Sequence, residues 1–177
     1  MSGATGRSTL AALTILALVV GAVAVVAALV LVRRERVLSP GGEIVYGDVG
    51  FSVVSSRTVA SLGEGAQRAD ARGAFRVVAL KVSNHSQRVP FRMGDYRAVL
   101  RDEDWRGYQV SPVGQAALGA PEPTAEIPPG ESHVSEFVFD VPADTRGLAL
   151  RITSGGPLMD LLDALVSGEG PPVLPLP

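Results

Sequence analysis

The sequence predicts an all-β fold, an antiparallel β-sandwich of 7–8 strands, preceded by one N-terminal transmembrane helix and followed by a short C-terminal amphipathic helix. After residue 42, apolar residues recur with a period of two rather than 3.6, which indicates strands with one buried face. Turn-forming residues separate these runs within about 110 residues, which is typical of a sandwich. Residues 10–32 instead form one uninterrupted apolar run.

This apolar run is long enough to cross a membrane. Residues 10–32 carry no charge, and the 23 residues would reach about 34 Å as a helix, slightly more than the hydrocarbon core of a bilayer. A cleaved signal peptide has a shorter apolar region, of about 7 to 15 residues. We therefore expect a retained single-pass anchor between a short tail at 1–9 and a stalk at 33–42.

Two arguments on the orientation of this anchor disagree. Arg7 precedes the run and three arginines follow it closely, and the positive-inside rule would keep the larger group, with its domain, in the cytoplasm. However, long segments translocate largely regardless of charge, and the domain resembles extracytoplasmic modules, as described below. We favour a cell-membrane protein with its C-terminal domain outside the cytoplasm.

A stripe of small residues within the run is compatible with self-association. Ala17, Gly21, Ala24 and Ala28 recur at helical spacing, and such faces let two membrane helices approach closely. Chance competes with this interpretation, because seven of the 23 residues are alanine. A homodimer through this stripe is therefore a hypothesis.

The sandwich is expected over residues 43–153. Val78, Leu80 and Val82 share one face of a strand while Lys81 points to the other, and the other strands alternate in the same way. The predicted strands are 49–53, 78–82, 96–101, 136–141 and 148–153, with shorter candidates at 43–46, 89–91 and 108–110.

Three segments are expected to lie outside this strand pattern. Glycines and charges at 63–73 are typical of a mobile loop, and five prolines without periodicity at 112–130 favour a disordered or partner-binding loop. In the C-terminal part, 154–177, leucines at helical spacing predict an amphipathic helix, and the tail GPPVLPLP tends to polyproline geometry. The leucines are Leu158, Leu161, Leu162 and Leu165.

Composition excludes several classes of function. Residues 1–40 carry four arginines and one glutamate, whereas residues 41–177 carry twelve basic and seventeen acidic residues. Nucleic acids are bound through clustered lysine and arginine, and here the basic residues are scattered among acidic ones, so we expect no nucleic-acid partner. The chain has no cysteine, which excludes disulfides and thiolate-bound metals.

Four stretches of the domain carry a family resemblance. They are VGFSVVS, FRVVALKVSNHS, YRAVLRDEDWRGYQV and IPPGESHVSEFVFDVP. Their order over residues 41–153 resembles the bacterial immunoglobulin-like family catalogued as domain of unknown function 4352, and is similar in layout to secreted immunoprotective antigens. The resemblance implies an immunoglobulin-like sandwich outside the cytoplasm. It implies no biochemical activity.

Few residues are candidates for a site. Asp102, Glu103 and Asp104 are weak metal-binding candidates, because calcium requires six or more oxygen ligands; a solvated hairpin turn is the better interpretation, and we expect no cofactor. Asn84 follows a strand, where it favours an Asx turn, although Asn84-His85-Ser86 is also a glycosylation sequon. Trp105 is expected to pack on the sandwich rather than stay exposed for a partner.

No catalytic motif accompanies these residues. The only histidines are His85 and His133, and neither is accompanied by a nucleophile motif or by metal-ligand spacing. We therefore predict that the chain is not an enzyme but an extracytoplasmic binding or interaction module of the cell envelope, with a possible protein partner. The alternatives are a purely structural envelope component and a ligand-sensing accessory subunit of a membrane complex.

Overall fold

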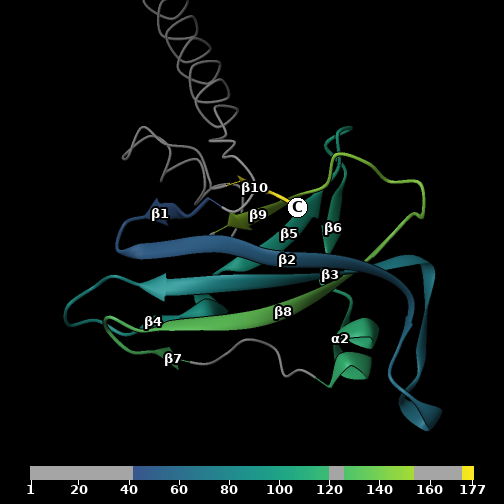
Figure 1. Ribbon diagram of the computed structural model, residues 1–177, viewed down its shortest axis with the longest axis horizontal. Helices are drawn as coiled ribbons and strands as arrows, with labels where there is room; N and C mark the ends of the chain where they lie inside the picture. Colours follow the sequence, from purple (N-terminus) through teal and green to yellow (C-terminus); the bar gives the residue numbers. More distant parts are fainter. Residues whose placement is uncertain (1–41, 120–125, 154–172) are drawn as a thin grey trace, which may run out of the picture.

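The computed structural model of the chain describes residues 42–119, 126–153 and 173–177 (Figure 1). The predicted membrane span 10–32, with its small-residue stripe, the tail 1–9, residues 33–41 of the stalk and the helix at 158–165 lie outside the described residues. In the part of the chain that is described, no helix is long and apolar enough to cross a bilayer.

Two antiparallel sheets face each other, which confirms the predicted β-sandwich (Figure 1). The first sheet has the strand order β1-β2-β3-β8: β1 (Ile44–Tyr46), β2 (Val49–Leu62), β3 (Ala69–Asn84) and β8 (Ser132–Val141). The second has the order β10-β9-β5-β6: β10 (Val173–Pro175), β9 (Ala149–Thr153), β5 (Arg97–Arg101) and β6 (Gly107–Gln109). A small third sheet pairs β4 (Phe91–Arg92) with β7 (Glu126–Ile127).

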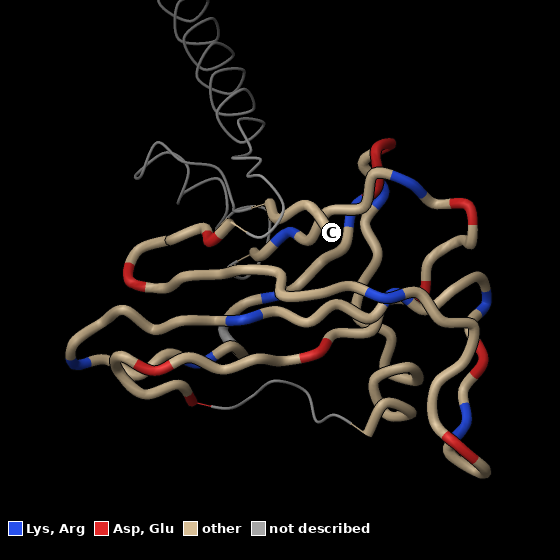
Figure 2. The backbone as a smooth tube through the Cα atoms, in the orientation of Figure 1, with Lys and Arg blue, Asp and Glu red and all other residues tan. Residues whose placement is uncertain are grey.

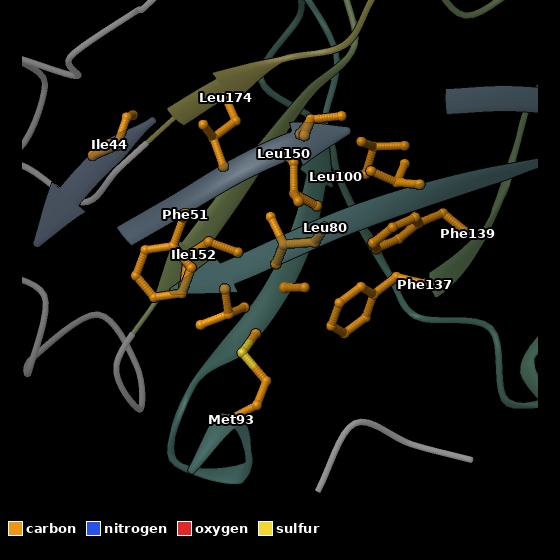
Figure 3. Packing of buried hydrophobic residues seen from close by; sticks show 14 of the residues in the cluster. Ile44, Phe51, Leu80, Met93, Leu100, Phe137, Phe139, Leu150, Ile152 and Leu174 are labelled. Carbon is orange, nitrogen blue, oxygen red and sulfur yellow. The ribbon is translucent and has the colours of Figure 1, made fainter. Parts of the chain in front are cut away.

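Alternation along the strands produces the core. Leu80 of β3 and Phe139 of β8 point from the first sheet toward Leu100 of β5 and Leu150 of β9 in the second, and all four are fully buried (Figure 3). Because successive side chains of a strand face opposite ways, every second residue enters this core. The strands predicted from the sequence therefore lie with their apolar faces directed into the core between the two sheets.

The segment 112–130 is more ordered than expected. It contains α2 (Pro112–Leu118), which begins with the Ser111 hydroxyl accepting from the backbone N–H of Gly114 at 3.2 Å. Gly119 ends the helix with φ +69°, a conformation that glycine adopts without strain. The expectation of a disordered loop is wrong for the described residues of this segment, because its serine, proline and glycine are helix-capping signals.

Helix α2 covers the outer edge of β8. The Gln115 side chain donates from Nε2 to the Glu136 carbonyl at 2.9 Å and accepts from the backbone N–H of Val138 at 3.1 Å. A Cβ atom at Gly114 would lie 2.5 Å from the Val138 side chain, so glycine is needed for this close approach. Gln115 thus pairs with β8 as a neighbouring strand would, which protects an edge that could otherwise pair with another chain.

The glycine-rich segment 63–73 is not an irregular loop. It holds a single 3₁₀ turn, η1 (Gly65–Gln67), and β3 begins directly after it at Ala69. The hairpin is supported by a second cluster on the outer face of the first sheet, where Phe75 and Val77 pack with Val138. Local composition indicated a loop, whereas this packing extends the strands.

The described part of the C-terminal tail, residues 173–177, contains a strand where polyproline geometry was expected. Val173–Pro175 is the strand β10, which pairs antiparallel with β9, and Leu174 is buried in the main core. Proline fits here because β10 is an edge strand, where a missing N–H does not interrupt the sheet. Residues 173–177 therefore belong to the sandwich that was expected to end at residue 153.

Candidate anion-binding site

A hollow of about 530 Å³ lies where β5 ends and where β9 and β10 pair. Four arginines line it, whereas only two acidic side chains, those of Asp102 and Glu103, do so. The arginines are Arg76, Arg101, Arg146 and Arg151. In contrast, Figure 2 shows charges of both signs dispersed over the rest of the described chain.

The ladder of the second sheet brings two of these arginines together. Arg101, the last residue of β5, lies opposite Ala149, and Arg151 lies two residues further along β9. Residues directly opposite each other share a face, so Arg101 and Arg151 are diagonal neighbours on the face away from the core. Arg151 also lies opposite Val173 of β10, and its side chain is buried.

Arg76 reaches the hollow from the other sheet. Arg76 occupies the same face of β3 as Val78 and Leu80. It lies opposite Phe139 of β8, and its side chain lines the hollow at the end of the apolar core. The Nε atom of Arg76 is buried and has no hydrogen-bond acceptor among the described residues. No carboxylate of the described residues forms an ion pair with the Arg76 guanidinium. A buried donor left unsatisfied costs about 1–3 kcal/mol, so an acceptor brought by a ligand would be strongly favoured.

The acidic residues of the hollow belong largely to a turn. The buried Asp102 carboxylate accepts from the backbone N–H of Arg106 and from the Tyr108 hydroxyl, each at 2.8 Å. Burial opposes ionisation of Asp102, but these two donors and the Arg106 guanidinium outweigh it, so the pKa of the carboxyl lies below its ordinary value of 3.8. Asp102 therefore stays ionised and holds the turn between β5 and β6.

Asp102 should contribute to stability in a pH-dependent way. Because its pKa is lower in the folded than in the unfolded protein, the contribution is complete above the ordinary value of 3.8 and is lost as the pH falls through the folded-state pKa. We expect Asp102→Asn to lower the melting temperature at neutral pH and to flatten its decline toward strongly acidic pH. Thermal melts across this range, with the exposed Asp104→Asn as the control, test it; parallel curves for wild type and Asp102→Asn would contradict it.

The structure does not assemble the predicted acidic cluster into a metal site. Asp102 bonds within its turn and Asp104 pairs with Arg106 at 3.1 Å, while Glu103 lies at the hollow. Among the residues that the structure describes, no group of three or more His, Asp or Glu side chains is placed to hold a metal ion. His85 instead lies 3.4 Å from Glu43.

Asn84 has the structural role that was favoured. Its side chain is 2% exposed, donates to the carbonyls of Val89 and Ile127 at 2.9 Å, and accepts from the backbone N–H of Ser86. The sequon is therefore inaccessible to glycosylation in the folded domain.

Trp105 differs from expectation. It is 56% exposed at the rim of the hollow, and the Arg101 guanidinium lies 5.5 Å from its ring centroid. The prediction that it packs on the sandwich is wrong, because the turn directs it outward from the end of the sheet.

The arginines of the hollow do not stand out as a site in the sequence. They lie on three strands and a loop that are far apart along the chain, so no local motif joins them. One signal was present, since Arg76 occupies an inward position in the alternating series that continues with Val78 and Leu80. A charged residue in a core-facing series is a hint of a functional position.

The sequence matches no model of a known protein family and no curated protein. Solved structures are similar to it: an uncharacterised β-sandwich protein of Clostridium difficile has a TM-score of 0.51 and 13% identity, over 81% of this chain and 95% of that one. The yjhA protein of Bacillus subtilis has a TM-score of 0.52 and 11% identity, over 78% and 98%. The secreted protein MPT63 of Mycobacterium tuberculosis has a TM-score of 0.51 and 20% identity, over 70% and 92%.

These likenesses concern the fold. The chain has the β-sandwich architecture of bacterial proteins that include a secreted one, consistent with an immunoglobulin-like fold. The finer resemblance to domain of unknown function 4352 stays a prediction.

Proposed function

We propose that the chain is an extracytoplasmic binding module, anchored in the cell membrane by residues 10–32, whose sandwich binds an anionic ligand in the arginine-lined hollow. The observation that carries this proposal is Arg76, whose buried Nε lacks an acceptor among the described residues, at a hollow with three further arginines. Arginine donors match the oxygens of carboxylate and phosphate groups, and hydrogen bonds between charged groups are roughly twice as strong as neutral ones.

The charge of the whole domain makes this cluster distinctive. Residues 41–177 have more acidic than basic residues, yet the hollow gathers twice as many arginines as acidic side chains. Asp102 bonds within its turn, and Arg76 forms no ion pair with a carboxylate among the described residues. A concave surface on which positive charge predominates raises the local concentration of anionic ligands.

Binding is favoured over catalysis by the chemistry of the lining. Among the described residues around the hollow there is no histidine, cysteine, serine or lysine. Arginine remains protonated near neutral pH and does not serve as a general base there. The proposed role of the hollow is therefore to hold and orient an anion.

The location of the module is supported by the sequence of the anchor and by the secreted neighbour among similar structures. A retained span would hold the sandwich at the membrane surface, where it could bind envelope components. We expect external protease to digest the domain on intact cells. Resistance until the cells are permeabilised would place the domain in the cytoplasm and contradict this part of the proposal.

Arg76→Met is the sharpest test of anion binding. Methionine keeps an unbranched stem of similar length but removes the charge and all donors. We expect at least a tenfold loss of affinity for inorganic phosphate, since a hydrogen bond to a charged group contributes about 1.5–3 kcal/mol. We expect unchanged or increased stability, because an unsatisfied buried donor is removed. Calorimetric titration and thermal melting of the full chain in detergent measure the two effects.

The matched control is Arg88→Met, which makes the same change in charge at an exposed arginine outside the hollow. It should bind phosphate as the wild type does. Equal losses in the two variants would show that net charge, and not the hollow, determines binding. Phosphate binding that is unaffected by Arg76→Met would overturn the proposed site.

A further inference from the structure

Trp105 has an unusual backbone conformation for a bulky residue. Its φ is +66°, and among the described residues it is the only one other than glycine with positive φ. The left-handed region costs an L-residue roughly 1–2 kcal/mol, whereas glycine adopts it freely. Stability alone would favour glycine here, so the indole at this position calls for another reason.

The turn holds Trp105 firmly in this strained position. The Trp105 N–H donates to the Asp102 carbonyl at 3.1 Å, and the Asp102 carboxylate bonds the next residue, Arg106, through its backbone N–H. The Tyr108 hydroxyl fixes the same carboxylate from β6. The outward placement of the indole is thus built into the turn.

The indole forms part of the wall of the arginine hollow. Arg101 lies over the ring at 5.5 Å, and more than half of the Trp105 surface remains exposed beside the arginines. Apolar side chains line the same hollow: Leu148, Ala149, Val173, Pro175 and Leu176. An anion without an apolar or ring portion would gain no favourable contact with the indole face and the apolar walls.

The size of the hollow points the same way. Its volume of about 530 Å³ falls within the range of roughly 300–1,000 Å³ that is typical of small-molecule sites. A single phosphate or carboxylate would fill a small part of it. A ring attached to the charged group would fill more and would contact the indole.

We propose that the hollow binds a cyclic anion, that is, a sugar or aromatic ring carrying a phosphate or carboxylate. The charged group lies at Arg76 beside the other arginines, and the ring lies against Trp105. This inference rests on the proposed anion-binding function and adds the class of ligand. Stacking on an exposed aromatic residue can raise affinity by roughly tenfold or more.

The test compares ring-bearing anions with a bare anion on the full chain in detergent. Inorganic phosphate, phenyl phosphate, glucose 6-phosphate and glucuronate are titrated calorimetrically. At least one ring-bearing probe should bind roughly tenfold more tightly than phosphate. Trp105 is the only tryptophan of the chain, so the bound ring should also change the intrinsic tryptophan fluorescence, whereas phosphate should change it less.

Two substitutions at Trp105 separate recognition from folding. Trp105→Gly should abolish the preference for ring-bearing probes, leave phosphate binding in place and raise the melting temperature, because glycine relieves the backbone strain. Trp105→Phe retains an aromatic face and should keep most of the preference. If Trp105 had only a structural role, Trp105→Gly would instead lower the melting temperature and leave the preference for ring-bearing probes unchanged.

The outcomes distinguish this inference from the function on which it rests. Equal affinity for phosphate and all ring-bearing probes, lost in Arg76→Met, would overturn the cyclic ligand and leave the anion site standing. Failure of every probe to bind would overturn both. Tight binding of phenyl phosphate alone would identify an aromatic ligand, and tight binding of the two sugar probes a saccharide; either supports the inference.

Discussion

Replacing Asn84 by aspartate is expected to destabilise the sandwich by about 3–5 kcal/mol at neutral pH. The two shapes are nearly identical, but the Asn84 amide donates to the carbonyls of Val89 and Ile127, and a carboxylate has no donor for either. The variant would place a negative charge against two carbonyl oxygens at a position that is 2% exposed. Urea unfolding at neutral and at mildly acidic pH measures the effect.

The pH dependence and a second variant make this result specific. Protonation of the introduced carboxylate restores one donor, so the Asn84→Asp variant should recover part of its stability as the pH falls. Asn84→Ala removes the donors without adding charge and should cost less, about 2–3 kcal/mol at either pH. If both variants unfold like the wild type, the amide does not join β3 to the loops beyond it.

Phe51→Ala should have an effect of similar size, about 3–5 kcal/mol. Phe51 is fully buried in β2, and its ring contacts Phe91 edge-on and Tyr96 at an inclined angle, each with 6.1 Å between ring centroids. The truncation removes a large apolar surface and opens a cavity between the sheets that rigid neighbours cannot fill. Denaturant unfolding should show a lower midpoint with an unchanged slope.

A surface valine on the same strand provides the control. Val54 is 57% exposed, so Val54→Ala should change the free energy of unfolding by less than about 0.5 kcal/mol. Should Phe51→Ala fail to fold, Phe51→Leu measures a smaller loss at the same position. A loss below about 1 kcal/mol for Phe51→Ala would mean that this aromatic cluster is not central to the core.

The sandwich could be predicted because strand alternation is a local property. The series Val78, Leu80 and Val82 shows which side of β3 is buried, whatever its neighbours are, and the main strands were found in this way. The proline content of 112–130 suggests disorder, whereas Ser111, Pro112 and Gly119 are the capping signals of the helix α2 that the structure contains. β10 could not be predicted, because the pairing with β9 that makes it a strand joins segments separated along the chain.

The site is harder to predict from the sequence than the fold, because it depends on contacts between segments that are far apart along the chain. The acidic residues 102–104 are adjacent in sequence and therefore suggest a metal site, but in the structure the Asp102 carboxylate bonds within its own turn. The arginines that line the hollow come from different strands, and only the register of β5 with β9, together with the facing sheet, brings them to one place.

The amino-acid sequence alone is enough to predict the class of fold, the acidic character of the domain, the absence of cysteine chemistry and the anchor at 10–32. These follow from composition and from periodicities that act over a few residues. Two features follow from the folded arrangement instead: Arg76 lies at a hollow without an acidic partner among the described residues, and Trp105 lies at the rim of this hollow. Such properties depend on which segments meet in space, and that is set by the packing of two sheets rather than by any local pattern.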